Sequence, residues 1–168
     1  MGELRTIPLT ARKITDEAWE PYGWLPVDDS DTRDAEYNYE FTWGDAHVNV
    51  ITHGFDEVEH TIAGSICRWF FRHDSHTQVL MGLNVDSIVA VAPADVDFSD
   101  PSHLDSVSAF VIRPLESIVL RRGTWHWGPY PLGQEPVRLF NVQGKGFVQD
   151  NTRVDVPARL SARFEVLS

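Results

Sequence analysis

The segment from residue 120 to residue 131 reads Leu120-Arg121-Arg122-Gly123-Thr124-Trp125-His126-Trp127-Gly128-Pro129-Tyr130-Pro131. Glycine reaches backbone angles that are closed to other residues and proline fixes its own, so this spacing predicts a strand, a tight turn, a second short strand and a turn. Rigid backbone would then hold His126, which can act as acid, base or metal ligand. Single histidines between tryptophans also occur in ordinary cores, so a second feature is needed to identify a site.

The rest of the chain is typical of an all-β protein. Short runs rich in β-branched and aromatic residues are separated by glycine and proline, at the spacing of a sandwich or barrel. They cover residues 37–43, 46–52, 62–73, 77–83, 87–91, 107–112, 117–120, 137–142 and 163–166. Because closing or stacking a sheet removes exposed strand edges, we expect a closed double sheet.

The two ends of the chain add smaller elements to this pattern. Residues 4–9 predict a short edge strand that ends at Pro8, and Thr15 predicts the cap of a helical turn that reaches Trp19 and is closed by Pro21. The tail from residue 150 to residue 168 is expected to pair back or to pack on a neighbouring subunit. We expect residues 1–168 to form a single domain with a short N-terminal helix.

Composition excludes several classes of protein. The formal net charge of -11 follows from 25 acidic and 14 basic residues, which is unsuited to binding nucleic acid or an anionic membrane surface. Cys67 is the only cysteine, so the chain can form neither an internal disulfide nor a thiolate zinc site, and we expect Cys67 to be buried. Charges interrupt every apolar run within residues 1–14, and the sequence has no run of about 18 apolar residues, which indicates a soluble, cytoplasmic protein.

A second polar cluster precedes the first in the sequence and reads Arg72-His73-Asp74-Ser75-His76-Thr77-Gln78. In a small barrel the ends of distant strands can face the same opening. Strand alternation puts His73 on the same face as Phe71 and turns Gln78 inward with Leu80. His76 falls in the turn, and we expect it to face solvent.

Other histidines and acidic residues give weaker patterns. The histidines at positions 47, 53, 60 and 103 lie in polar contexts without a partner at ligand spacing, so we expect surface positions for them. The alternating aspartates of residues 95–100 lack the glycine and the distal glutamate of a calcium loop, which favours a solvated loop.

Both clusters together resemble the ureidoglycolate lyase family, also called ureidoglycolate hydrolase. The resemblance rests on Arg72-His73 followed by Thr77-Gln78, and on Arg122, Trp125 and His126 followed by a proline. The opening residues, Ile7-Pro8-Leu9-Thr10 and later Tyr22-Gly23, are also similar to that family. The resemblance implies a cupin fold, a double-stranded β-helix that commonly forms homodimers, and cleavage of ureidoglycolate into glyoxylate and urea.

Carried over residue by residue, the resemblance places His73, Gln78 and His126 around a pocket, with Arg72 and Arg122 nearby. This chain departs from the family at Trp127, where a second histidine is usual, and at Phe71, where an acidic residue is usual. The acidic residues that the family carries near positions 137–143 are also missing. These departures bear on the substrate more than on the fold.

Breakdown of ureidoglycolate requires a base for the hydroxyl proton and an acid for the departing urea nitrogen. Our hypothesis assigns these catalytic roles to His73 and His126. It assigns the substrate carboxylate to Arg72 or Arg122, and the orientation of an oxygen or a metal to Gln78. The remaining substrate-binding residues are Trp125 and Trp127, which would exclude water and shape the opening.

A divalent metal ion is a possible cofactor, because His73, Gln78 and His126 could supply three ligands. Two alternatives to ureidoglycolate cleavage stay open. One is a related cupin enzyme that acts on another small carboxylate or sugar acid, and the other is a non-catalytic cupin that binds a small ligand. A metal-dependent oxygenase fits less well, because its ligand set is incomplete.

Overall fold

The chain folds into strands with only short helices, as seen in a computed structural model that describes residues 4–40 and 45–168. The strands are β1 (Arg5–Lys13), β2 (Gly23–Trp24), β3 (Ala46–His53), β4 (Ser65–Cys67), β5 (Trp69–Arg72), β6 (Gln78–Gly82), β7 (Ser87–Ala92), β8 (Ser108–Ile112), β9 (Ser117–Leu120), β10 (Trp125–Pro131), β11 (Val137–Gly144), β12 (Thr152–Asp155) and β13 (Ala162–Leu167). The helices are α1 (Asp16–Trp19) and α2 (Val156–Leu160), with 3-10 turns η1 (Phe55–Glu57) and η2 (Pro101–Ser106). Within the described residues, no helix has the length and apolarity that a membrane crossing needs.

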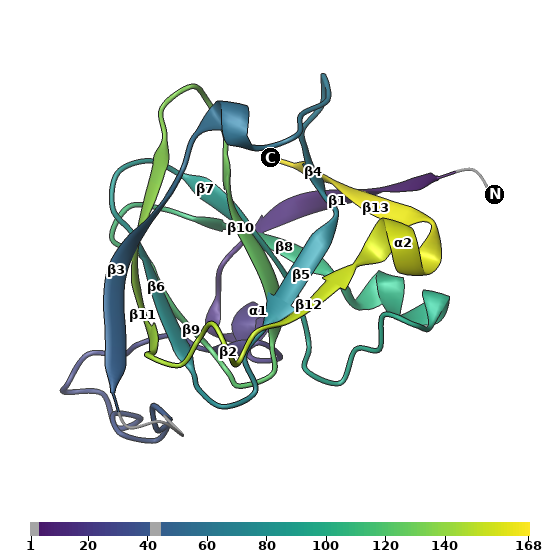
Figure 1. Cartoon of the computed structure of the whole chain (residues 1–168). Helices are drawn as coiled ribbons and strands as arrows, with labels where there is room; N and C mark the ends of the chain where they lie inside the picture. The colour runs from purple at the N-terminus through teal and green to yellow at the C-terminus, as the bar shows by residue number, and fades with distance from the viewer. Residues whose placement is uncertain (1–3, 41–44) are drawn as a thin grey trace.

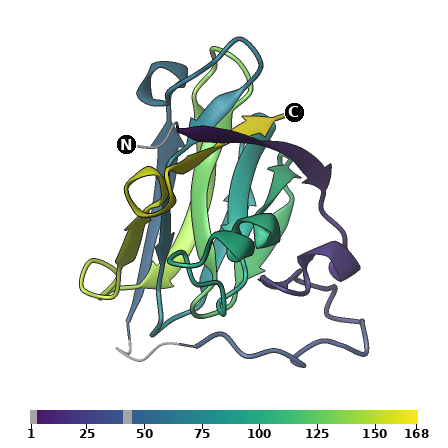
Figure 2. The ribbon, with the colours of Figure 1, turned by 90° about the vertical axis from the view of Figure 1, so that its right-hand side faces the viewer.

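Two sheets face one another, which confirms the expected all-β, cupin-like fold. One sheet has five strands in the order β2-β9-β6-β11-β3, and the other has eight in the order β12-β5-β10-β7-β8-β1-β13-β4. Figure 1 shows β3 and β11 on one side of the molecule and β5, β12 and α2 on the other. In the perpendicular view of Figure 2, β1 runs across the strands that stand upright.

The central strand β7 of the eight-stranded sheet is buried on both faces. All six residues of β7 are buried, with Val89 and Val91 in the core between the sheets and Ile88 and Ala90 in a second core behind them. The second core is covered by β13, α2 and the segment around Phe98. Because a strand buried on both faces needs no polar alternation, β7 reads as a continuous apolar run.

The turn before β10 depends on Gly123, whose φ of 80° lies in the left-handed region that glycine adopts without strain. From there β10 pairs with β7 on one side and meets β5 through His126 and Phe71 on the other. A bulge between Trp127 and Tyr130 interrupts the register with β7. The predicted turn and rigid strand around His126 are therefore confirmed.

Several expected elements differ from those observed. Residues 37–40 form no strand, and residues 41–43 of that predicted strand lie outside the described residues. The predicted strand over residues 62–73 is two strands, β4 and β5. Pro8 does not end β1, which continues to Lys13; residues 5–10 pair with β13 alone, so a proline without an amide proton is tolerated on the side that has no partner strand.

Other expectations about the ends of the chain and the core are confirmed. Thr15 caps α1 by accepting a hydrogen bond from the Ala18 amide. The tail pairs back, because β12 adds to β5 and β13 pairs with β1 and β4. Cys67 is fully buried, and burial raises the pKa of its thiol to about 12.

Trp19 should be the side chain in α1 that matters most for stability. It is fully buried against Tyr22 and Phe110, and its indole nitrogen donates to the Val119 carbonyl at 3.0 Å. Trp19→Ala should lower the free energy of unfolding by about 3–5 kcal/mol, as large-to-small core changes do. Urea denaturation measures this, and Trp24→Ala serves as control.

The control removes a half-buried tryptophan that stacks on Tyr37 with ring centroids 5.1 Å apart. Losing such a pair should cost only about 1 kcal/mol. Equal losses in the two variants would contradict the assignment of Trp19 to the core.

Candidate functional site

A cavity of about 300 Å³ lies between the two sheets. Strands β3, β6 and β11 supply one wall, and β5, β7 and β10 supply the other. Its polar lining consists of His53, His73, Gln78, His126, Gln143 and Asn151, and its apolar lining includes Phe71, Leu80, Trp127 and Phe147. A second cavity of about 570 Å³ adjoins it through His53 and Trp127, which line both.

Three imidazoles of the cavity are held in the same way. His126 Nδ1 donates to the Thr124 carbonyl at 2.9 Å, His53 Nδ1 donates to the Pro129 carbonyl at 2.9 Å, and His73 Nδ1 donates to the Asp150 carbonyl. A carbonyl oxygen can only accept, so each Nδ1 carries the proton when the ring is neutral. Each Nε2 is then a lone-pair acceptor available to a ligand.

Gln78 adds a fourth acceptor from β6. Its Nε2 donates to Asn141 Oδ1 at 2.7 Å, whereas its Oε1 is buried and has no hydrogen-bond partner. An unpaired buried carbonyl is costly, so this oxygen is open to a ligand or a water molecule. The structure therefore brings together His73, Gln78 and His126, the three residues that the sequence pattern placed around one pocket.

Burial keeps the central histidines uncharged at neutral pH. Loss of hydration and, to a smaller extent, the neighbouring His73 lower the pKa of His126 to about 3. The pKa of His73 is also lowered, chiefly by burial. The His126 ring is therefore neutral and acts as an acceptor through Nε2.

The other predicted binding residues divide between the cavity and its surroundings. Trp127 lines the cavity, with its ring 4.7 Å from that of Phe71. Trp125 does not, because strand alternation turns it into the second core, where its Nε1 donates to the Val96 carbonyl at 3.1 Å. Trp125 was predicted to bind substrate, but it lies on the opposite face of β10 from His126 and does not line the cavity.

Neither predicted arginine lines the cavity. Arg72 lies on the opposite face of β5 from His73, stacked over the Trp125 ring at 4.6 Å and ion-paired with Asp74 at 3.3 Å. Arg122 is about half exposed and pairs with Glu40 at 2.7 Å, which fastens the segment before β3 to the barrel. The described part of the lining contains no charged residue, so nothing there neutralises a carboxylate.

His76 is the clearest correction to the sequence reading. It is 2% exposed rather than facing solvent, and its ring stacks on His73 with centroids 4.5 Å apart. Burial lowers the pKa of His76 to about 4. Position in a turn predicted exposure, but Asp150 and Gly144, from distant parts of the chain, cover the ring.

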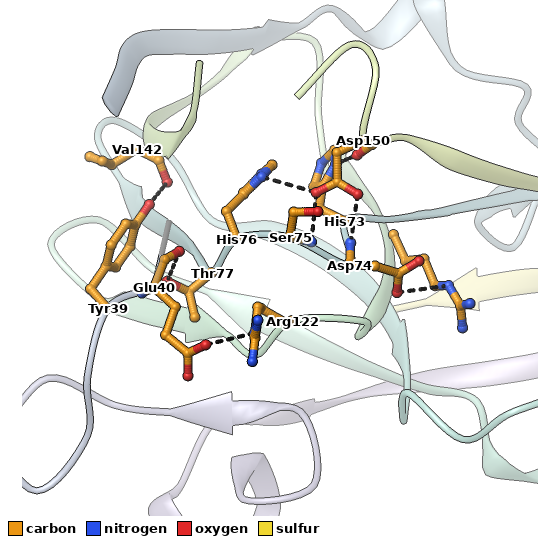
Figure 3. A network of polar contacts seen from close by, with 11 residues as sticks. Tyr39, Glu40, His73, Asp74, Ser75, His76, Thr77, Arg122, Val142 and Asp150 are labelled. Atoms are coloured by element: carbon orange, nitrogen blue, oxygen red, sulfur yellow. Dashed lines mark hydrogen bonds and ion pairs between the residues drawn. The ribbon is translucent and has the colours of Figure 1, made fainter. Parts of the chain in front are cut away.

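Asp150 ties the turn after β5 to the C-terminal segment (Figure 3). Its carboxylate accepts from the amides of Asp74 at 2.9 Å and Ser75 at 2.8 Å, and lies 3.2 Å from His76 Nδ1. The ligand atoms of His73, His76 and Asp150 lie within 4.8 Å of one another, so this cluster could hold a metal ion. His73 therefore belongs to two possible groups of metal ligands, one with His76 and Asp150 and the other with Gln78 and His126.

Several lining residues escaped the sequence analysis. His53 is half-buried in the cavity wall rather than at the surface, because β3 pairs with β11 and turns it inward. Its alternation with Ile51 was the available signal. Gln143 and Asn151 carried no recognisable pattern, since single amides resemble any polar position.

Comparison with known proteins identifies a protein family that the chain matches. A family model described as Ureidoglycolate lyase matches residues 6–161. No curated protein matches the chain. Among solved structures, the BH2720 protein from Bacillus halodurans shares 15% identity, with a TM-score of 0.40 over 70% of this chain and 80% of that one. A recombinant oxalate oxidase in complex with glycolate shares 16% identity, with a TM-score of 0.38 over 88% of this chain and 73% of that one.

Buried neutral histidines make stability depend on pH in a defined direction. The pKa values of His76 and His126, about 4 and about 3, lie below the ordinary value of 6.5, so the unfolded chain binds more protons below that pH. Their contribution is complete above the unfolded value and is lost as pH falls below it. In EDTA, the free energy of unfolding should therefore fall from about pH 7 to about pH 5.

Urea denaturation across this range measures the effect. His126→Gln should flatten the dependence, because it removes one group that must lose its proton on folding. A slope unchanged by the substitution would contradict the inferred neutral imidazole.

Proposed function

Because this chain belongs to the ureidoglycolate lyase family, we propose that it is a lyase-type enzyme that cleaves a small hydroxy-acid derivative, with ureidoglycolate as first candidate. One observation carries the proposal. His73, His126 and Gln78 present acceptors without protein partners to a single cavity with apolar walls. Such convergence of polar groups in an apolar pocket is typical of a ligand site.

His126 suits the proton transfer of this reaction. The substrate hydroxyl proton moves to His126 Nε2, the oxygen electron pair forms the carbonyl of glyoxylate, and the carbon–nitrogen bond breaks toward urea. The same proton then passes from the imidazolium to the departing nitrogen, so atoms and charge balance. Because burial lowers the pKa of His126 to about 3, the imidazolium gives up its proton readily in the second step, while the neutral ring is a weak base in the first.

The backbone supports this cycle. The Thr124 carbonyl fixes the His126 ring at 2.9 Å and stabilises the transient imidazolium through the Nδ1 proton. Trp127 and Phe71 cover the cavity and keep water from the departing nitrogen. The side-chain amides of Gln143 and Asn151 offer partners for the ureido group.

A divalent metal fits the donor set. His73 Nε2, His126 Nε2 and Gln78 Oε1 would hold it, because all three are acceptors and the Gln78 oxygen has no hydrogen-bond partner. A bound metal would supply positive charge for the substrate carboxylate. This arrangement is an alternative to the proton transfer by His126, because a ligating Nε2 cannot also take a proton. His53, whose Nδ1 donates to the Pro129 carbonyl, is then the remaining imidazole for the substrate proton.

A non-catalytic binding protein is the second candidate, favoured by the absence of charged residues from the described lining of the cavity. A binder would gain thermal stability from the ligand without forming product.

Another small carboxylate or sugar acid is the alternative enzyme substrate. The predicted homodimer and cytoplasmic location stay predictions.

Turnover of ureidoglycolate tests the proposed function. Purified protein should release glyoxylate and urea, and His126→Ala should lower kcat by a factor of about 100 to 10,000, the usual contribution of a positioned acid or base. His103→Ala, on η2 and away from the cavity lining, is the matched control and should keep wild-type activity. Full activity in His126→Ala would reject the assigned role.

Metal content separates the two ligand groups. Protein purified without an affinity tag should carry about one equivalent of a divalent metal, consistent with three protein ligands and an open position. Gln78→Leu should lose it, whereas His76→Phe, which keeps an aromatic ring against His73, should retain it. Loss in His76→Phe with retention in Gln78→Leu would place the ion at Asp150 instead.

A further inference from the structure

Three side-chain amides form a row across the five-stranded sheet. Gln78 Nε2 donates to Asn141 Oδ1 at 2.7 Å, and Asn141 Nδ2 donates to Asn49 Oδ1 at 2.8 Å. Asn141 lies directly opposite Asn49 on β3 and opposite Leu80 on β6, which makes Gln78 its diagonal neighbour. The row begins in the cavity and ends at an exposed residue on the edge strand.

The two hydrogen bonds give this row a direction, from Gln78 through Asn141 to Asn49. Asn141 is fully buried and Gln78 is 5% exposed, so neither amide can leave a donor unpaired without a large cost. An amide that donates to its neighbour must present its oxygen on the other side. Each residue in the row therefore fixes the orientation of the next.

The consequence reaches the cavity at Gln78. With its Nε2 committed to Asn141, the group left for the cavity is Oε1, which is buried and without a hydrogen-bond partner. Reversing the row would present the Nε2 donor instead, and a donor cannot hold a cation. When a cation is bound, the lone pairs of His73 and His126 act together with the Gln78 oxygen, whereas the amide donors of Gln78 could not share that cation.

We propose that Asn141, held by Asn49, is a positioning residue that keeps the Oε1 of Gln78 facing the cavity as an acceptor for a divalent cation. This inference rests on the proposed function, because it concerns the same site. Asn141 touches neither the cavity nor a ligand, since it is absent from the lining and acts only through Gln78.

Nuclear Overhauser effects in the metal-free protein test the orientation directly. The side-chain amide protons of Gln78 should show contacts to the β protons of Asn141 and none to the ring protons of His73 and His126. Asn141→Asp can only accept, so it should preserve this pattern, whereas Asn141→Leu should lose it. Contacts from the amide protons to the imidazole rings in wild type would overturn the proposal.

Binding of Mn²⁺, followed by electron paramagnetic resonance, tests the consequence. Asn141→Leu should weaken Mn²⁺ binding about 10- to 100-fold, the usual effect of losing an outer-shell partner, and Asn141→Asp should restore most of it. A purely structural role predicts the opposite order, because a buried carboxylate harms packing at least as much as leucine does. Equal affinities in wild type and Asn141→Leu, or no Mn²⁺ binding in wild type, would overturn the proposal.

Asn49→Leu supplies a variant that should fold, since residue 49 is exposed. It should weaken Mn²⁺ binding in the same direction, while Val48→Leu, on the other face of β3, should not. These experiments distinguish failure of the proposed function from failure of the positioning role. If wild type shows no turnover but has the expected contacts and Mn²⁺ affinities, the enzymatic function is rejected and the positioning role is kept. Turnover in wild type with unaltered Mn²⁺ binding in Asn49→Leu and Asn141→Leu would reject only the positioning role.

Discussion

Burial on both faces of β7 and β10 is the constraint that governs this structure. One face of these strands packs into the core behind the sheet, and the other faces the space between the sheets. A polar side chain that points inward must therefore find its partners without water. The imidazoles do so through backbone carbonyls, and Gln78 does so through Asn141. The same bonds that stabilise these groups also decide which atom each presents to a ligand.

The cavity is consequently polar but uncharged along its described lining. Neutral imidazoles and amides can recognise hydroxyl and amide groups through hydrogen bonds, but they cannot balance a carboxylate. The arginines expected to do this are engaged elsewhere, Arg72 with Asp74 and Trp125, and Arg122 with Glu40. A cation held by the acceptors would resolve the mismatch, which links the amide row to the substrate class.

Strand alternation could predict the centre of the site, because it depends only on neighbours in sequence. It correctly turned His73 and Gln78 inward, and it places Arg72 and Trp125 on the opposite faces of their strands from the histidines beside them. His76 could not be placed from local pattern, and for His53 the alternation with Ile51 was the one local signal. The burial of His76 depends on Asp150 and Gly144, and that of His53 on the pairing of β3 with β11. The row from Gln78 to Asn49 needed the register of three strands, which no local signal encodes.

The pairing of β1 with β13 has a kinetic consequence. These strands lie side by side and parallel, although nearly the whole described chain separates them, as in the contact between Arg163 and Thr6. Joining them closes a very long loop, so the chain loses conformational entropy before the contacts between the two strands stabilise it. We therefore expect slow folding, in which the two strands associate late and the core behind the eight-stranded sheet stays open until they do.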